Sequence, residues 1–410
     1  MKKVIAAFLI WRVLTLLVAF FSPSFIPTFG ATFPYYDERL VSTGFPHLIW
    51  SLGNFDGVHY LGIANEGYAA QFTQAFFPFY PLLIKMISFL TLGNLFVSAV
   101  LISNTAFLAG LLVFYKLLKI YFSGKVSFWS IVFLLSFPTS FFFGSVYTEG
   151  LFFFLTVGTF YLAEKNKLFL SALTGTAASA TRLIGIFLTT AFIIASRKPQ
   201  SIRLGMNAKS DYILTRNGSF LHASKLKKTI PRTFSPRKFI KSGKNAQELL
   251  YASAVPLGLV AYMTYLGIKF QDPLYFLTSQ SAFGQDRSTQ SIVLLPQVIF
   301  RYLKILATTG GLTFASALFD LICTALAIGL LIYAIKKVKT PWLIFSFVSI
   351  ILPTLTGTLA SMPRYVLVAF PIFIVLAAIK STIIKLSIIA AFIITGAISL
   401  ALFSQGYWVA

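Results

Sequence analysis

Residues 53–81 gather the side chains of this chain that could carry out acid–base chemistry. Asp56, His59 and Tyr60 lie within about one helical turn of one another, and Tyr68 follows in the same stretch. Asp and Glu together number only 11 in 410 residues, so a carboxylate in a short polar stretch is a strong candidate for a functional group. A positioned carboxylate can accept the proton of an attacking alcohol. We therefore take Asp56 as the candidate general base.

The rest of the sequence lacks the motifs of several other classes of catalytic or cofactor-binding site. It contains no Walker-type phosphate loop, no dinucleotide-binding glycine motif and no HExxH zinc motif. Its 3 histidines are too scattered for a convincing zinc site, and no nucleophile elbow accompanies a Ser-His-Asp set. What remains is carboxylate chemistry assisted by basic side chains that hold an anion, such as the phosphate of a lipid-linked leaving group.

The composition places these residues in a membrane protein. Hydrophobic residues make up 57% and charged residues 11% of the chain, whereas soluble proteins carry about a quarter charged residues. We expect one all-α polytopic domain over residues 1–410, surrounded by membrane lipids. The net charge of +23 is uneven, because residues 197–247 hold thirteen Lys or Arg residues and one acid, Asp211. This pattern predicts a cytoplasmic loop that can touch anionic lipid, and we expect no nucleic acid partner.

The apolar segments set the topology that positions the candidate residues. Met1 to Lys3, followed by apolar residues 4–21, predict an uncleaved first span with its N-terminus inside. Residues 22–75 then form the first extracytoplasmic loop, because no run there reaches the roughly 20 apolar residues of a span. Two short helices on the membrane surface are expected in this loop, around 37–51 and 54–66.

Two topologies fit the next apolar segments, which are 76–92, 95–115, 126–143, 150–163 and 168–196. Counting each segment as one crossing leaves several lysines outside. In the second topology, 76–92 lies in the outer leaflet or re-enters, and 168–196 is broken at Thr181-Arg182 into two half-helices. The lysines then fall inside, while Glu149 and Arg182 face outward. The positive-inside rule favours this second arrangement.

The later segments complete a bundle of about 10–11 membrane segments. Arg364 and Tyr365 fall at the outer face, and Asp320, inside an apolar span, receives no role. The expected spans are 249–269, 312–335, 341–360, 364–379 and 383–403, and residues 270–309 form an outer loop with a juxtamembrane segment. The candidate polar residues therefore share the extracytoplasmic face.

Each candidate also has a simpler structural interpretation. Asp56 could cap a surface helix, His59 could make interfacial hydrogen bonds, and Glu149 could cap the apolar helix that it begins. Arg182 is unfavourable at membrane depth by about 2.5–3.5 kcal/mol unless it is paired, so a phosphate or Glu149 is its expected partner, with snorkelling as the alternative. Arg364 either binds a lipid phosphate or marks the interface.

Five ordered motifs resemble one known family. They are FDGVHYLGIANEGY, AFFPFYPL, LISNTAFLAG, FPTSFFFGSVYTEGLFFFLT and ASATRLIGI, which cover residues 1–195 well, with QDPLYFLTSQSAFG and PRYVLVAFP following more loosely. This arrangement resembles the PIG-V family, the GPI mannosyltransferase II of eukaryotes and its prokaryotic relatives. The resemblance implies a GT-C-fold glycosyltransferase that uses a polyprenyl-phosphate sugar, which is dolichyl-phosphate mannose in eukaryotes.

The resemblance also assigns residues. The family's Trp-Asp pair maps to Phe55-Asp56, which keeps an aromatic ring but loses the indole donor. The family follows its Arg with Ser-Asn-Gly, where this chain has Leu183-Ile184-Gly185 after Arg182. His59, Gly67-Tyr68 and the family's Y[ST]E pattern at Tyr147 and Glu149 also match. The expected substrate-binding set is His59, Tyr60, Tyr68, Tyr147, Glu149, Arg182, Arg364 and Tyr365.

The function implied is transfer, with inversion, of a mannosyl or related residue from a polyprenyl-phosphate sugar to an extracytoplasmic or lumenal glycan or glycolipid. No cofactor is indicated; a divalent metal could help hold the donor phosphate, although no ligand cluster argues for one. The membrane is the cytoplasmic membrane of a prokaryote or the endoplasmic reticulum of a eukaryote. Two alternatives stay open: a lipid-linked glycan ligase or polymerase, and a polytopic lipid or sugar transporter.

Overall fold

The computed structural model describes residues 1–29, 33–192, 243–283, 287–288 and 291–409, together with two short strands that pair antiparallel, β1 (Tyr212–Leu214) and β2 (Phe220–His222). All other regular elements in the described ranges are helices. Five of its helical stretches are long and apolar enough to cross a membrane. They are α1 (Lys2–Phe21), α6 (Leu95–Leu118), α11 with α12 (Gly243–Ala254 and Leu257–Phe270), α15 (Gly311–Ala334) and α19 (Thr382–Ser404). The expected all-α polytopic membrane fold is confirmed.

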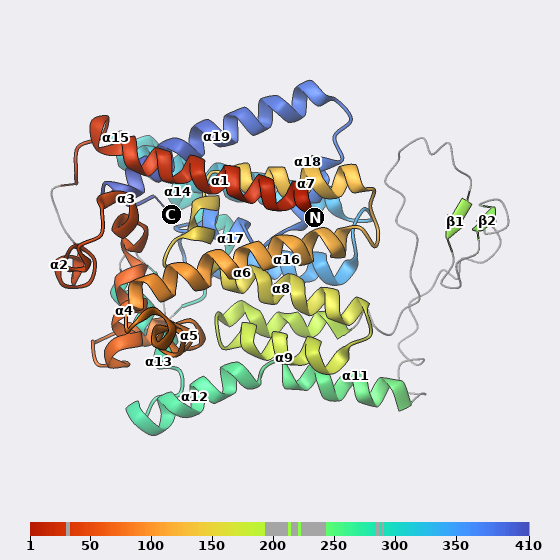
Figure 1. The fold of residues 1–410 in the computed structure, drawn as a ribbon, viewed down its shortest axis with the longest axis horizontal. Helices are drawn as coiled ribbons and strands as arrows, with labels where there is room; N and C mark the ends of the chain where they lie inside the picture. Colours follow the sequence, from red (N-terminus) through yellow and green to blue (C-terminus); the bar gives the residue numbers. More distant parts are fainter. Residues whose placement is uncertain are drawn as a thin grey trace.

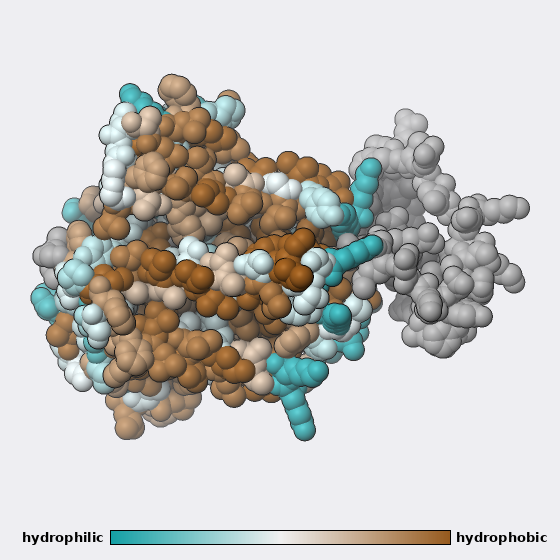
Figure 2. Space-filling view, turned by 90° about the horizontal axis from the view of Figure 1, so that it is seen from above, coloured by the Kyte–Doolittle hydropathy of each residue, from teal (hydrophilic) through white to brown (hydrophobic). Residues whose placement is uncertain are grey.

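The long helices α1, α6, α12 and α19 run roughly along one axis of the molecule (Figure 1). The surface over them is hydrophobic for most of its length, and strongly hydrophilic side chains project mainly near one end (Figure 2). An apolar helix surface faces lipid readily because a helix satisfies its own backbone hydrogen bonds. The long axis of the molecule is therefore the axis along which it crosses the membrane.

Shorter helices pack among and beside these long ones. They are α7 (Gly124–Ser136), α8 (Glu149–Glu164), α9 (Leu168–Ser179), α16 (Thr340–Thr354) and α18 (Pro371–Ala377). Helix α8 packs against α6 most closely at Gly150, where an added Cβ would lie 2.6 Å from the carbonyl oxygens of Ser103 and Phe143. Beside this contact the rings of Phe107 and Phe143 stack with centroids 4.1 Å apart. The N-terminus of α8 is thus fixed firmly against α6.

The two ends of the bundle differ in character. One end, which we call the α4 end, gathers the short helices α2 (Tyr36–Arg39), α3 (His47–Trp50), α4 (Asp56–Glu66), α5 (Phe79–Ser88) and α13 (Tyr275–Thr278), at the left of Figure 1. At the other end lysines border the helices, for example Lys339 over the Tyr121 ring at 4.5 Å and Lys385 over the Trp129 ring at 5.3 Å. This separation follows the division that the positive-inside rule describes.

The predicted interruption of 168–196 is confirmed. Helix α9 ends at Ser179, Arg182 is extended with φ −153° and ψ 144°, and the chain continues as a 3₁₀ helix, Leu183–Ala191. The segment 76–92 contains only the 10-residue helix α5 and one 3₁₀ turn, too short to cross a membrane. Both features agree with the second of the two topologies considered.

Two predicted helices are wrong as continuous elements. The helix expected around 37–51 is split into α2, a 3₁₀ turn and α3, because Gly44 adopts φ +69° and Pro46 precedes α3. Residues 364–379 form two short buried helices, α17 (Met362–Val366) and α18, rather than one span. Most of the basic loop 197–247 lies outside the described residues, and the total number of membrane segments stays a prediction.

Candidate active site

The chain enters α4 through a strained residue that is held on both sides. Phe55 has φ 58° and ψ −112°, a combination that residues with side chains rarely adopt. Its ring packs against Phe33, Phe403 and Trp408 with centroids 4.9, 5.8 and 5.2 Å away. Just before it, the buried Asn54 side chain donates to the Phe403 carbonyl at 2.8 Å. These contacts maintain the strain and fix where α4 begins.

Asp56 is the first residue of α4, and it does not act as the helix cap. The N-cap residue is Phe55, and no side chain caps this helix. Instead, the Asp56 carboxylate accepts from the Arg364 guanidinium, with 2.9 Å between Oδ2 and Nη2, and 19% of its side chain remains accessible. The carboxylate is therefore held in one orientation while it can still meet another molecule.

Glu149 forms the buried centre of the site. It is the first residue of α8, and its side chain is fully buried. Its Oε1 accepts from Arg182 Nη1 at 3.0 Å and from Arg364 Nε and Nη2 at 3.1 and 3.0 Å. Arg182 reaches it from the break after α9, and Arg364 reaches it from α17. Glu149 is thus the partner that the sequence had offered for Arg182 in place of a phosphate.

Asp56, Glu149, Arg182 and Arg364 together form what we call the charge cluster. Two carboxylates balance two guanidiniums, as buried ions require, because an unpaired buried charge is strongly unfavourable. The Glu149 Oε2 atom has no hydrogen-bond partner among the described residues. Arg364 and Arg182 approach this carboxylate from different segments, so the cluster ties α4, α8, α9 and α17 together.

Aromatic rings surround both guanidiniums. Arg364 lies 4.9 Å from the Phe142 ring centre and 4.8 Å from that of Tyr147, while Arg182 lies 5.3 Å from the ring of Tyr365. The Tyr147 hydroxyl also donates to the Asn54 carbonyl at 2.7 Å, which links the cluster to the start of α4. Such rings stabilise a cation where water is excluded. Tyr147 and Tyr365, both predicted site residues, therefore contact the cluster directly.

His59 lies one turn after Asp56 and is held between rings. It stacks on Phe76 with centroids 5.0 Å apart and meets the edge of Phe283 at 5.2 Å. Burial lowers the pKa of His59 to about 4, an effect that the charge of Asp56 opposes and that of Arg39 reinforces. His59 is therefore neutral at physiological pH.

The two predicted tyrosines of this region differ in what lies near them. Tyr60 is buried with its ring edge-on to Phe76 and Tyr80, and its pKa is raised by burial and by the nearby carboxylates of the charge cluster. Tyr68 donates to the Phe76 carbonyl at 2.7 Å and packs on Tyr262 of α12, so it fixes the turn after α4. In the described chain the contacts of Tyr68 lead to α12 and not to the charge cluster.

The sequence did not single out Asn54, although it is central to the geometry. The side chain of Asn54 bonds to backbone carbonyls 349 and 350 residues later in the chain. No local pattern could have revealed those partners. The only available signal was its position directly before the Phe55-Asp56 pair.

The site lacks the features of a metal centre in the part of the chain that the structure describes. No group of three or more His, Cys, Asp or Glu residues converges there. Asp56 Oδ2 and Glu149 Oε1 each contact a guanidinium, which already offsets the charge of these carboxylates.

Comparison with known proteins identifies the family. Residues 1–202 match the family model described as Mannosyltransferase (PIG-V), and these residues supply Asp56, His59, Tyr147, Glu149 and Arg182. No curated protein matches the chain. The match agrees with the resemblance found in the sequence motifs. The chain thus belongs to the PIG-V mannosyltransferase family and is an integral membrane glycosyltransferase.

Proposed function

We propose that this protein transfers mannose from a polyprenyl-phosphate donor to a hydroxyl group of a glycan or glycolipid at the extracytoplasmic or lumenal face of its membrane. The family match supports mannosyl transfer, and the apolar spans support a substrate that is anchored in the same membrane. The donor class, the acceptor class and the face of the membrane are parts of the proposal.

The observation that carries the mechanism is the unequal exposure of the two carboxylates. Glu149 is completely buried, whereas 19% of the Asp56 side chain is accessible. Only Asp56 can meet an acceptor hydroxyl without rearrangement. Arg364 holds the Asp56 carboxylate in place, and such positioning is what general base catalysis needs.

In the proposed reaction the acceptor oxygen attacks the anomeric carbon of mannose. A new C1–O bond forms as the C1–O bond to phosphate breaks, and the bonding electrons leave with the polyprenyl phosphate. Asp56 takes the acceptor's proton, and attack opposite the leaving group inverts the anomeric centre. The residues of the chain supply the base and its positioning.

Arg182 and Arg364 were predicted to hold the donor phosphate. Both side chains already contact carboxylates, so the charge cluster carries no net positive charge of its own. In this proposal Arg364 orients Asp56, and Arg182 stabilises Glu149. A phosphate contact by either arginine stays a prediction.

The test uses membranes that contain the full chain and radiolabelled polyprenyl-phosphate mannose. We expect Asp56→Asn to lower the rate of mannose discharge by at least ~100-fold at normal expression, because a positioned base contributes typically about 10²–10⁴-fold. Glu66→Gln is the matched control, since Glu66 is an exposed carboxylate at the other end of the same helix. Near-normal discharge by Asp56→Asn would remove Asp56 from the role of base.

A further inference from the structure

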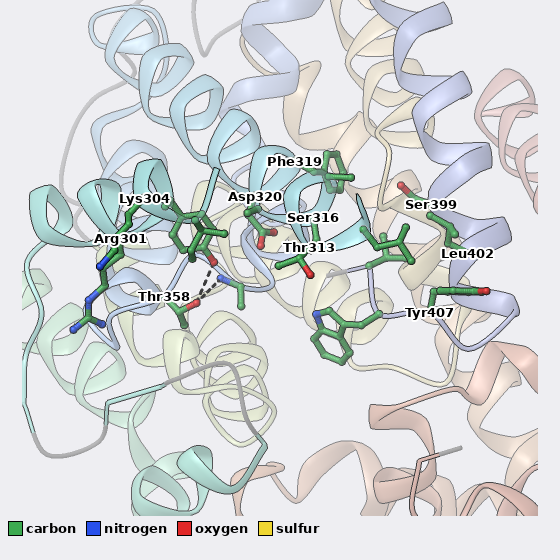
Figure 3. A pocket seen from close by; sticks show the side chains of 18 of the residues that line it. Arg301, Lys304, Thr313, Ser316, Phe319, Asp320, Thr358, Ser399, Leu402 and Tyr407 are labelled. Carbon is green, nitrogen blue, oxygen red and sulfur yellow. Dashed lines mark hydrogen bonds between the residues drawn. The ribbon is translucent and has the colours of Figure 1, made fainter. Parts of the chain in front are cut away.

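A large cavity lined by none of the four residues of the charge cluster has no role in the mechanism so far. Its volume is about 1130 Å³, and it is lined by α14 (Leu295–Thr308), the first turns of α15, the end of α19 and the C-terminal residues Tyr407 to Val409. Figure 3 shows Arg301 and Lys304 at one side, Asp320 in the middle and Tyr407 at the other. All of these elements lie beyond residues 1–202, which match the family model.

Two cations border this cavity. Arg301 and Lys304 are one turn apart on α14, both are exposed, and neither forms an ion pair with any described residue. Arg301 donates to the Gly357 carbonyl at 3.2 Å. Gly357 has φ +88°, and an added Cβ there would lie 2.8 Å from Arg301 Nη1, so the chain leaves room for the guanidinium at this point. Unlike the arginines of the charge cluster, these cations are available to an anion.

Two exposed apolar side chains line the cavity. Leu312 of α15 and Ile398 of α19 are 53% and 55% exposed. Both helices are membrane-spanning candidates, so these side chains border the lipid. A cavity that combines two free cations with exposed apolar side chains on spanning helices fits an anionic lipid.

The mostly apolar lining of the cavity includes one buried acid with an oxygen that lacks a hydrogen-bond donor among the described residues. Asp320, to which the sequence assigned no role, is 5% exposed, lines the cavity, and has an Oδ1 atom without a partner in the described structure. A buried carboxylate oxygen needs a donor, and sugar hydroxyls are suitable donors. The ring of Trp408 also lines the cavity and packs on Phe55, the residue before Asp56, at 5.2 Å.

The cavity wall connects to the charge cluster through the backbone. The Tyr302 hydroxyl lies 3.1 Å from Thr358 Oγ1 and accepts from the Leu359 amide at 3.0 Å, which fixes α14 to the segment 357–360. That segment leads directly into α17, which carries Arg364. The lining of the cavity is therefore connected to the charge cluster in two ways. One connection is the contact of Trp408 with Phe55, and the other is the segment 357–364.

We propose that this cavity binds the lipid-phosphate donor, with its phosphate on Arg301 and Lys304, its isoprenoid chain leaving past Leu312 and Ile398, and its sugar directed toward Asp320 and Trp408. This inference rests on the proposed transfer from a polyprenyl phosphate. When the C1–O bond breaks, the phosphodiester becomes a monoester and gains negative charge. Arg301 and Lys304 then stabilise the leaving group more strongly than the intact donor.

The test measures binding of polyprenyl phosphate to the purified full chain in lipid nanodiscs, so its readout does not depend on sugar transfer. We expect the double variant Arg301→Gln, Lys304→Gln to bind roughly 10- to 100-fold more weakly, because it loses two charge-assisted contacts. The matched control is Lys85→Gln, Lys269→Gln, which removes the same charge from exposed positions outside the cavity and keeps wild-type binding. The conservative variant Arg301→Lys restores most of the affinity.

Two further ligands separate the contribution of the phosphate to the affinity from that of the isoprenoid chain. Uncharged polyprenol should bind the wild type and the double variant alike, and inorganic phosphate should displace polyprenyl phosphate poorly, since it lacks the chain. Equal binding of polyprenyl phosphate by wild type and double variant overturns the assignment, and so does equal loss in the lysine control. If binding depends on Arg301 and Lys304 but the wild type discharges no mannose, the cavity assignment stands and the proposed transfer fails. If the wild type discharges mannose but binding does not depend on Arg301 and Lys304, the proposed transfer stands and the cavity assignment fails.

Discussion

Asp56 and Glu149 share one guanidinium. Arg364 Nη2 lies 2.9 Å from Asp56 Oδ2 and 3.0 Å from Glu149 Oε1, so one arginine holds the accessible carboxylate and the buried one together. This geometry separates two roles that a sequence alone would treat alike. Glu149 stabilises the arginines that it contacts, and Asp56 remains able to meet a substrate.

The division of roles predicts that Glu149→Gln mainly lowers stability and that Asp56→Asn mainly lowers activity. Glu149→Gln leaves Arg182 without a charged partner among the described residues and leaves Arg364 paired with Asp56 alone, so we expect it to lower the free energy of unfolding by about 3–5 kcal/mol. Asp56→Asn should lower it less, because that carboxylate is partly exposed, although it abolishes most of the activity. Unfolding temperatures measured in detergent should decrease in the order wild type, Asp56→Asn, Glu149→Gln.

The control for this comparison is Glu66→Gln, whose exposed carboxylate lies 3.5 Å from Arg39. Exposed ion pairs contribute about 0–1 kcal/mol, so this variant should unfold close to the wild type. A larger loss of stability for Asp56→Asn than for Glu149→Gln would contradict the roles assigned here.

The lowered pKa of His59 predicts that the stability of the protein depends on pH. Its pKa is lowered to about 4 from the ordinary value of 6.5, mainly by burial. Between these two values the unfolded chain binds a proton that the folded chain does not, so stability falls as the pH decreases from 6.5 toward 4. His59→Gln cannot be protonated and should lose this part of the dependence. Unfolding midpoints measured at several pH values check the difference, and parallel curves for the two proteins would refute it.

The packing of the Phe55 ring predicts that the position of Asp56 depends on an aromatic side chain at residue 55. Removing the ring in Phe55→Ala takes away its contacts with Phe33, Phe403 and Trp408, while the unfavourable backbone conformation stays. We expect mannose transfer to fall about 10- to 100-fold, since small displacements of a catalytic group have effects of this size.

Phe55→Trp is the matched variant, because it restores a ring and should keep most of the rate. Steady-state rates with saturating donor distinguish the two variants. Equal activity of Phe55→Ala and wild type would show that the ring does not position Asp56.

The sequence predicted the membrane fold, the interruption at Arg182 and the family, because these follow from local composition and from ordered motifs. It offered Glu149 as a partner for Arg182, since a buried arginine needs an acid. It could not predict that Arg364 joins them, because that contact spans 215 residues and depends on how α17 packs. For the same reason Asp320 had no assigned role until the cavity around it was known.

The split helix around 37–51 and the paired short helices at 362–377 were missed for a related reason. The first was expected as a surface helix and the second as an apolar span, and their breaks come from Gly44, Pro46 and Pro371 together with tertiary contacts. Periodicity reports which face of a segment is apolar but not where packing interrupts it.

The origin of Arg364 has a practical consequence for engineering this enzyme. Four charged side chains meet at one point, yet only three of them come from the part of the chain that matches the family model. A hybrid that joins residues 1–202 to the second half of a relative would inherit a carboxylate pair whose shared counter-charge must come from the foreign half. Such hybrids should work only when the acquired half delivers an arginine to the place that Arg364 occupies.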